Sequence, residues 1–183
     1  MRKPTMEENN LSTHIKEVGE IIQGLESLGF QPVLVGGMAL ILLGSQRVTQ
    51  DFDFVISDPV ERLSDVVGLF YKRGMELVSK TDENGQVIRT IDNQKVAKIR
   101  LKIDCPNSVY FYNPKTRLRI DLLFDFPILA SELAGSANRI KVSSYIISIA
   151  SEKDLLRLKK IAKSKRSKAG DAEDLIFLKS RKK

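Results

Sequence analysis

The 183-residue chain contains only one cysteine and one histidine. The single cysteine, Cys105, excludes an internal disulfide framework and leaves no CxxC pair for a structural zinc site. The single histidine, His14, excludes a metal site built from several histidines, and it is poorly placed to serve a serine or cysteine nucleophile. Any catalysis by this chain therefore has to rest on other side chains.

Long apolar stretches are also missing. No run approaches the roughly 20 residues that a membrane-spanning helix needs, and the first ten residues, MRKPTMEENN, lack the apolar segment of a secretory signal. Hydrophobic residues form 42% of the chain and charged residues 29%, as in ordinary soluble domains. We therefore expect a folded cytoplasmic protein without a membrane partner.

Positive charge is in excess only at the C-terminal end. Residues 151–183 contain 12 Lys/Arg and 5 Asp/Glu, whereas residues 1–150 contain 18 of each. Such a patch suits a polyanion, such as a nucleotide or an RNA backbone, or an acidic protein, although a solvated lysine-rich helix is the plain alternative. Because the hydrophobic period also changes near residue 150, we expect an α/β core over 1–150 and a basic helical segment over 151–183 packed on it.

The hydrophobic periodicity predicts helices interspersed with strands. Helices are expected at about 11–28 (capped by Asn10 or Ser12), 38–43, 58–74 and 127–134. Two more are expected within 151–178, separated by a basic loop. Strands are expected at 32–35, 50–57, 96–103, 108–112, 117–124 and within 139–149, together with a hairpin over 75–91. The turn of this hairpin is expected at Asp82-Glu83-Asn84-Gly85, since Asn-Gly favours the tight primed turn.

Three carboxylates mark the chemistry. Asp51 and Asp53 stand two residues apart in a predicted strand, so both point to one face while the intervening phenylalanines face a core. Neighbouring carboxylates repel each other, and a bound Mg²⁺ removes that cost. Asp121 lies on a second predicted strand whose other face is apolar. If the two strands are neighbours, three carboxylates are available to hold two metal ions for in-line phosphoryl chemistry.

A glycine pair supplies the second half of the expected site. Gly36 and Gly37 end one predicted strand and open a helix, which is a favourable place for an anion such as phosphate. Arg47 and Thr49 precede the first aspartate, where they either hold phosphate or brace the loop and a carboxylate. Carboxylates for metal and a turn for phosphate together predict a nucleoside triphosphate site.

The order of these motifs resembles a known signature. Val35-Gly36-Gly37-Met38-Ala39-Leu40, followed by Arg47-x-Thr49-x-Asp51-Phe52-Asp53-Phe54, is similar to the signature of the nucleotidyltransferase superfamily, which has the palm fold of DNA polymerase β. Within it the likeness is greatest to small bacterial AbiEii-type and minimal nucleotidyltransferases. Residues 154–159 and 171–175 resemble the C-terminal helical segment of those proteins. Residues 61–114 carry no resemblance.

The resemblance implies an α+β fold with a mixed central sheet flanked by helices and a C-terminal helical segment. It also implies Mg²⁺ or Mn²⁺ and a nucleoside triphosphate as co-substrate. The implied catalytic and metal-binding residues are Asp51, Asp53 and Asp121, the last nearer the acceptor hydroxyl. The candidate nucleotide-binding residues are Gly36, Gly37, Arg47, Thr49 and, through the likeness alone, Lys159. Many members of the superfamily have serine where this chain has Gly37.

The implied activity is transfer of a nucleoside monophosphate, in which a metal-activated hydroxyl attacks the α-phosphorus and pyrophosphate leaves. The basic C-terminal segment favours RNA, including a tRNA end, or a protein as acceptor over a small molecule such as an antibiotic. The AbiEii likeness suggests a toxin with an antitoxin partner. The alternative is a non-catalytic module of the same fold that binds RNA or a protein.

Several other residues have open interpretations. Tyr110, Phe111 and Tyr112 either stack on a base or fill a strand. Cations that alternate along the strand expected at 96–103 either are solvated or line an acceptor groove; they are Lys98, Arg100 and Lys102. The candidates for contact with an RNA backbone are Lys163, Lys165, Arg166 and Lys168. Asp171 and Asp174 either pair with these cations or cap the last helix.

Overall fold

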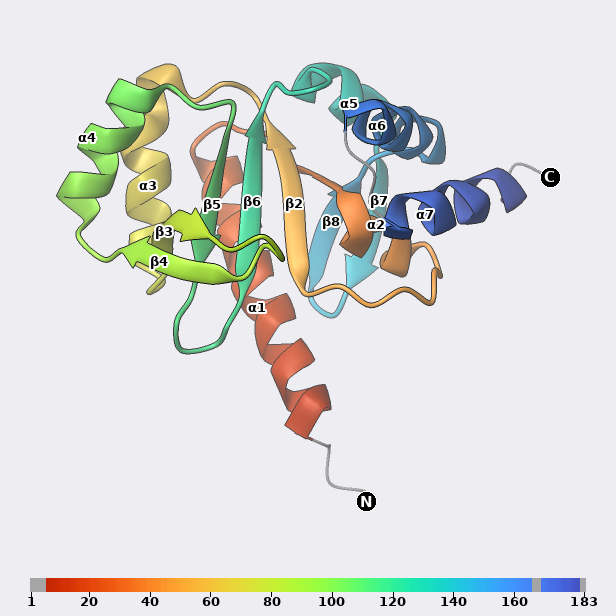
Figure 1. Ribbon diagram of the computed structural model, residues 1–183, viewed down its shortest axis with the longest axis horizontal. Coiled ribbons are helices and arrows are strands. Elements are labelled where there is room, and N and C mark those ends of the chain that lie inside the picture. The colour runs from red at the N-terminus through yellow and green to blue at the C-terminus, as the bar shows by residue number, and fades with distance from the viewer. Residues whose placement is uncertain (1–5, 166–168, 182–183) are drawn as a thin grey trace.

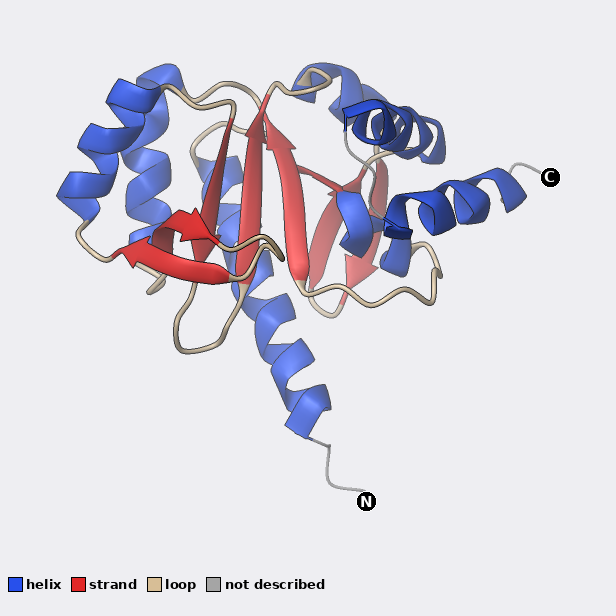
Figure 2. Ribbon diagram, viewed as in Figure 1, coloured by secondary structure: helices blue, strands red, loops and turns tan. Residues whose placement is uncertain are grey.

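A single eight-stranded sheet forms the centre of the molecule, with helices on both of its faces (Figures 1 and 2). The structure is a computed structural model and describes residues 6–165 and 169–181. Figure 1 shows α1 and α3 behind the sheet, α4 beside α3, and α2 and α7 in front of it. No helix among the described residues is long and apolar enough to span a bilayer.

The strands are β1 (Val33–Val35), β2 (Asp51–Ile56), β3 (Glu76–Thr81), β4 (Val87–Ile91), β5 (Ser108–Tyr112), β6 (Arg119–Phe124), β7 (Asn138–Val142) and β8 (Tyr145–Ile149). The α-helices are α1 (Met6–Ser27), α2 (Gly36–Leu42), α3 (Leu63–Tyr71), α4 (Gln94–Asp104), α5 (Ala130–Ser136), α6 (Glu152–Lys165) and α7 (Ala169–Ser180). A short 3₁₀ turn, η1 (Val60–Arg62), precedes α3.

The strand order is β4-β3-β5-β6-β2-β1-β8-β7. The pairs β2–β6 and β1–β8 are parallel and the remaining pairs are antiparallel, so the sheet is mixed. This confirms the predicted α+β class with a mixed central sheet flanked by helices. The division of the chain into two parts at residue 150 is not tested by the sheet topology and stays a prediction.

The faces of the central strands are set by alternation. Phe52 and Phe54 of β2 and Phe111 of β5 are buried on the face that α1 and α3 cover. The ring of Phe111 stacks on Phe70 of α3, with 4.1 Å between the ring centroids. Because successive residues of a strand point to opposite faces, the polar residues between these aromatics are placed on the other face of the sheet.

The strand predicted at 96–103 is wrong, because this segment is helix α4. Its start is capped by Asn93, whose side chain accepts hydrogen bonds from the backbone of Lys95 and Val96. Only Ala97 and Leu101 are buried, which is the four-residue spacing of one helix face. The strand-like alternation came from Ile99, Leu101 and Ile103 between cations, but Ile99 and Ile103 are exposed on the helix.

Element ends differ from the prediction in three further places. Helix α1 begins at Met6, so Asn10 and Ser12 lie inside it and do not cap it. The hairpin of β3 and β4 and its turn at 82–85 are confirmed, with the backbone N–H of Gly85 donating to Asp82 O at 3.1 Å, but its strands begin at Glu76 and Val87, each one residue later than predicted. The helix expected at 127–134 begins only at Ala130, where Asp125 Oδ1 accepts a hydrogen bond from its backbone N–H at 2.7 Å.

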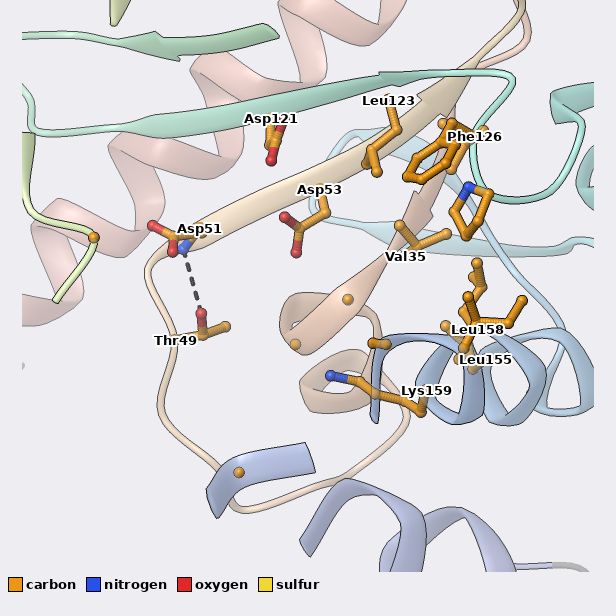
Figure 3. Close-up of a pocket in the computed structure, with 18 of the residues that line it drawn as sticks. Val35, Thr49, Asp51, Asp53, Asp121, Leu123, Phe126, Leu155, Leu158 and Lys159 are labelled. Carbon is orange, nitrogen blue, oxygen red and sulfur yellow. Dashed lines mark hydrogen bonds between the residues drawn. The ribbon is translucent and has the colours of Figure 1, made fainter. Parts of the chain in front are cut away.

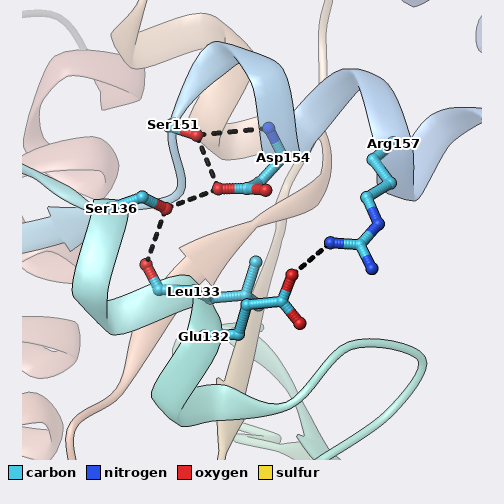
Figure 4. A network of polar contacts seen from close by, with 6 residues as sticks. All are labelled: Glu132, Leu133, Ser136, Ser151, Asp154 and Arg157. Carbon is cyan, nitrogen blue, oxygen red and sulfur yellow. Dashed lines mark hydrogen bonds and ion pairs between the residues drawn. The ribbon is translucent and has the colours of Figure 1, made fainter.

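A polar network joins α5 to the start of α6 (Figure 4). The hydroxyls of Ser136 and Ser151 donate to Asp154 Oδ2 at 2.5 and 2.6 Å, and Arg157 pairs with Glu132 on the surface. Burial raises the pKa of Asp154, but the two hydroxyl donors and the nearby positive charges outweigh burial, and the pKa lies below the ordinary value of a carboxyl. This network holds the start of α6 in place, and α6 lines the cavity described in the next section.

Candidate active site

The register of two parallel strands brings the three carboxylates together. In the β2–β6 pair, Asp53 stands directly opposite Asp121, and Asp51 stands opposite Arg119. Asp51, Asp53 and Asp121 therefore share one face of the sheet, and Figure 3 shows all three pointing to the same cavity. The expectation that these strands are neighbours is confirmed.

The carboxylate oxygens are close neighbours without forming a ready metal cage. Among the described residues, no group of three His, Cys, Asp or Glu side chains is gathered in a metal-binding arrangement. Asp51, whose side chain is 44% exposed, lies with its Oδ1 atom 3.5 Å from Arg119 Nη1. That oxygen is shielded from solvent and accepts no hydrogen bond from the described residues. The donor set suits a hard divalent cation, and rotation of side chains would be needed to gather it.

Gly36 is required where the chain passes the central carboxylate. Its φ of +68° lies in the left-handed region, and a Cβ atom at this position would stand 1.9 Å from Asp53 Oδ2. Any larger residue would therefore collide with the side chain of Asp53 and strain the backbone as well. The glycine expected beside phosphate thus directly adjoins the carboxylates.

The side chain of Arg47 packs directly against Gly37. A Cβ atom at Gly37 would lie 2.9 Å from the Cζ atom of Arg47 and 3.1 Å from Cγ2 of Thr49. The guanidinium of Arg47 therefore occupies the space into which a serine side chain at position 37 would extend. Its Nε atom is shielded from solvent and donates no hydrogen bond to the described residues. An unused cationic donor beside the glycine turn suits an anion.

Opposite the sheet, α2, α6 and the loop that carries Arg47 form the helical wall of the cavity. One buried carboxylate pairs with two cations of this wall. Asp174 of α7 has a side chain only 2% exposed, and it forms ion pairs with Arg47 and, at 2.6 Å, with Nζ of Lys159. Lys159 extends from α6 towards the cavity and is 11% exposed (Figure 3). The sequence leaves two roles open for Asp174, pairing with the cations at 163–168 or capping the last helix. Its ion-pair partners are instead Arg47 and Lys159, and it lies inside α7. Residues 166–168 lie outside the described residues.

Tyr110 lies on the sheet wall of the cavity, which strands β2, β5 and β6 form. In the β5–β6 pair it stands opposite Asp121, and it lines the cavity, whereas Phe111 belongs to the core. Burial, followed by the negative charge of Asp51, raises the pKa of Tyr110 to about 12. Its hydroxyl is therefore neutral at physiological pH and available as a hydrogen-bond donor beside the carboxylates.

The cavity has a volume of about 760 Å³, within the range of ligand-binding pockets. Every residue proposed for the site lines it: Gly36, Gly37, Arg47, Thr49, Asp51, Asp53, Asp121 and Lys159. Thr49 Oγ1 accepts a hydrogen bond of 3.4 Å from the backbone N–H of Asp51, so it braces the loop (Figure 3). Lys98, Arg100 and Lys102 lie on α4 and do not line the cavity.

Three residues were missed or misjudged by the sequence reasoning. Asp174 was assigned other partners, Arg119 was not considered as a partner of Asp51, and Phe126, which lines the cavity, was passed over. The position of Phe126 directly after a strand that carries an aspartate was the only available signal. His14 Nε2 donates a hydrogen bond of 2.7 Å to the backbone carbonyl of Thr116, and His14 does not line the cavity.

Comparisons with known proteins agree with this geometry at the level of fold. No family model and no curated protein sequence matches the chain. The antibiotic-resistance factor ANT(2'')-Ia in complex with adenylyl-2''-tobramycin matches over 93% of this chain and 90% of its own, with a TM-score of 0.60 and 12% identity. The lincosamide antibiotic adenylyltransferase LnuA, bound to lincomycin, matches over 90% and 96%, with a TM-score of 0.56 and 14% identity.

A nucleotidyltransferase-like protein from Paracoccidioides brasiliensis matches over 91% of this chain and 76% of its own, with a TM-score of 0.56 and 17% identity. At such low identities these likenesses show that the chain has the nucleotidyltransferase fold, which confirms the predicted fold family. They do not test the narrower resemblance to AbiEii-type proteins, which stays a prediction.

Proposed function

We propose that this protein is a metal-dependent nucleotidyltransferase that moves a nucleoside monophosphate from a nucleoside triphosphate to a hydroxyl acceptor. The observation that carries the proposal is the cavity itself, in which Asp53 stands opposite Asp121 and adjoins Gly36, and which Arg47, with its unused donor, also lines. Carboxylates and cations on opposite walls match a ligand that consists of phosphates and divalent metal.

The helical wall would bind the triphosphate. Arg47 Nε and the backbone at Gly36 and Gly37 would donate to phosphate oxygens, and Lys159 would contribute positive charge. Because Asp174 already holds both cations, they are kept in place before the ligand arrives. Preorganised charges of this kind need little rearrangement as charge develops on the transferred phosphate.

The sheet wall would bind the metal ions and the attacking group. Asp51 and Asp53 would hold two Mg²⁺ or Mn²⁺ ions, and Asp121 would help to hold the one nearer the acceptor. Bound there, the ions would supply positive charge that neutralises the phosphates and acidifies the acceptor hydroxyl. The hydroxyl oxygen forms a bond to the α-phosphorus, its proton passes to a base at the carboxylates, and the bond to the leaving pyrophosphate breaks. Tyr110 would orient the acceptor as a neutral donor.

The acceptor that we propose is RNA, such as a tRNA end, or a protein hydroxyl. Exposed lysines on the last two helices support a polyanionic partner; the described ones are Lys153, Lys160, Lys163 and Lys179. The antibiotic adenylyltransferases of the same fold make a small hydroxylated molecule the competing acceptor. A toxin role in the cytoplasm, with an antitoxin partner, extends the proposal on the AbiEii resemblance alone.

The test is a transfer assay with Mg²⁺ and each of the four α-labelled triphosphates. Total RNA, total protein, tobramycin and lincomycin are offered as separate acceptors. We expect label transfer to one acceptor, and we expect Asp53→Asn to abolish it. Asp65→Asn is the matched control, because Asp65 is exposed, pairs with Arg62 and does not line the cavity.

Absence of transfer with every acceptor would contradict the enzymatic proposal. RNA binding that persists without transfer and is unchanged in Asp53→Asn would support the non-catalytic binding module instead. For the toxin extension, expression of the wild type should arrest growth and expression of Asp53→Asn should not.

A further inference from the structure

The cavity changes from polar to apolar along the sheet. On β2, Asp51 and Asp53 are followed on the same face by Val55, and on β6 Asp121 is followed by Leu123. Both strands run in the same direction, so their hydrophobic residues lie side by side at one end of the cavity. A ligand that fills the whole cavity therefore needs a charged part and an apolar part.

The facing helix repeats this change. Lys159 of α6 lies towards the polar end, whereas Leu155 and Leu158 lie at the apolar end with Val35 (Figure 3). Phe126, which follows β6, closes this end from the sheet side, and 37% of its surface is exposed. The apolar end thus lies between a helix and an aromatic ring, which is a suitable shape for a flat group.

We propose that this apolar end is the nucleobase subsite, with Phe126 as its stacking surface, and that it selects purines over pyrimidines while distinguishing adenine from guanine poorly. The inference rests on the proposed function. It gives a binding place to the nucleobase, for which the phosphate-binding residues provide none. The described side chains that form this end are Val35, Val55, Leu123, Phe126, Leu155 and Leu158.

The chemistry of these side chains explains the selectivity. None of the six can exchange hydrogen bonds with the edge of a base, so recognition depends on contact area and stacking. Stacking tolerates different bases because every base has a π face, and it strengthens with ring area. If the base occupies the apolar end and the phosphates lie at Arg47 and Lys159, the polar end of the cavity, near Tyr110, remains for the acceptor.

Isothermal titration of the full chain with Mg²⁺ tests the inference. The probes are inorganic tripolyphosphate and the non-transferable α,β-methylene analogues of ATP, GTP, CTP and UTP. We expect the two purine analogues to bind within about threefold of each other and several-fold more tightly than the pyrimidine analogues. Phe126→Ala should weaken purine binding about tenfold and leave tripolyphosphate binding within about twofold, because only the base contacts the ring.

Two variants complete the test. Phe126→Leu keeps an apolar side chain without a ring, so it should lose the preference for purines and retain binding of the triphosphates. Leu129→Ala is the matched control, because Leu129 is exposed, lies three residues further on and does not line the cavity.

The possible failures are distinguishable. Equal losses for tripolyphosphate and the purine analogues in Phe126→Ala, an unchanged purine affinity in that variant, or equal affinities of the wild type for purine and pyrimidine analogues would overturn the nucleobase subsite alone. A wild type that binds neither tripolyphosphate nor any analogue would overturn the proposed function together with it.

Discussion

The two walls of the cavity hold opposite charges by different means. On the sheet wall, Asp53 and Asp121 are placed by backbone register, and no group of three acidic, cysteine or histidine side chains is gathered in a metal-binding arrangement among the described residues. On the helical wall, Arg47 and Lys159 are placed by side-chain ion pairs to one buried carboxylate, Asp174. The difference indicates that the sheet wall depends on its ligands for charge balance, whereas Asp174 already offsets part of the positive charge of the helical wall.

Removing a sheet-wall carboxylate should produce the largest effect, and only on activity. We expect Asp121→Asn to lower the transfer rate about a thousandfold, on the scale of losing a group that stabilises transition-state charge. The free energy of unfolding without metal should stay the same or rise, because repulsion from Asp53 is relieved. Single-turnover transfer and urea unfolding measure the two quantities, and a clear loss of stability would remove the contrast between the walls.

Removing the helical-wall carboxylate should have the opposite signature. Asp174→Asn leaves two inward cations without their counter-charge, and we expect a loss of about 3 kcal/mol in the free energy of unfolding. Urea unfolding checks this value. Glu132→Gln, which breaks the exposed pair with Arg157, should cost only about 0.5 kcal/mol. Equal losses in the two variants would show that burial of Asp174 has no special role.

Crowding the glycine turn should test the link between the walls. Gly37→Ser forces the guanidinium of Arg47 away, and overpacking of this kind costs about 1–2 kcal/mol. Arg47→Ala should make the serine tolerable, so the double variant should be more stable than the sum of the single changes predicts. A double-mutant cycle in urea measures this coupling; strict additivity would mean that Arg47 does not fill the space beside Gly37.

The smallest effect concerns the network that anchors α6. Ser136→Ala removes a hydrogen bond to Asp154 and should cost about 1 kcal/mol at neutral pH. Because the pKa of Asp154 is lowered in the folded state, its contribution is present above the unfolded pKa of about 4 and is lost as pH falls through the folded value. The difference between wild type and variant should therefore shrink in urea titrations below pH 4; a constant difference would contradict the assignment.

The carboxylate wall could be predicted because its signals are local. Alternation around Asp51 and Asp53 fixes the face of β2, and the apolar residues around Asp121 fix that of β6. Two strands with polar residues on one face and a shared core on the other need only a parallel pairing to bring these carboxylates together, and this pairing is what the structure shows.

The helical wall could not be predicted in the same way. Arg47 and Asp174 meet across most of the chain, and the helical period indicates which face of α7 is buried but not which side chain it meets. Helix α4 was mistaken for a strand because its exposed isoleucines, Ile99 and Ile103, alternate with cations. Phe126 lies in a loop, where no period assigns a direction to a side chain.

The β2–β6 pairing also determines when the cavity can exist during synthesis. A hairpin, two helices and another strand separate these two strands in the chain, so their closure pays a large loop entropy. A nascent chain that ends before β6 contains Asp51 and Asp53 without their neighbour, and the last helices that carry Lys159 and Asp174 emerge later still. We therefore expect the cavity to be complete only after α7 has been synthesised.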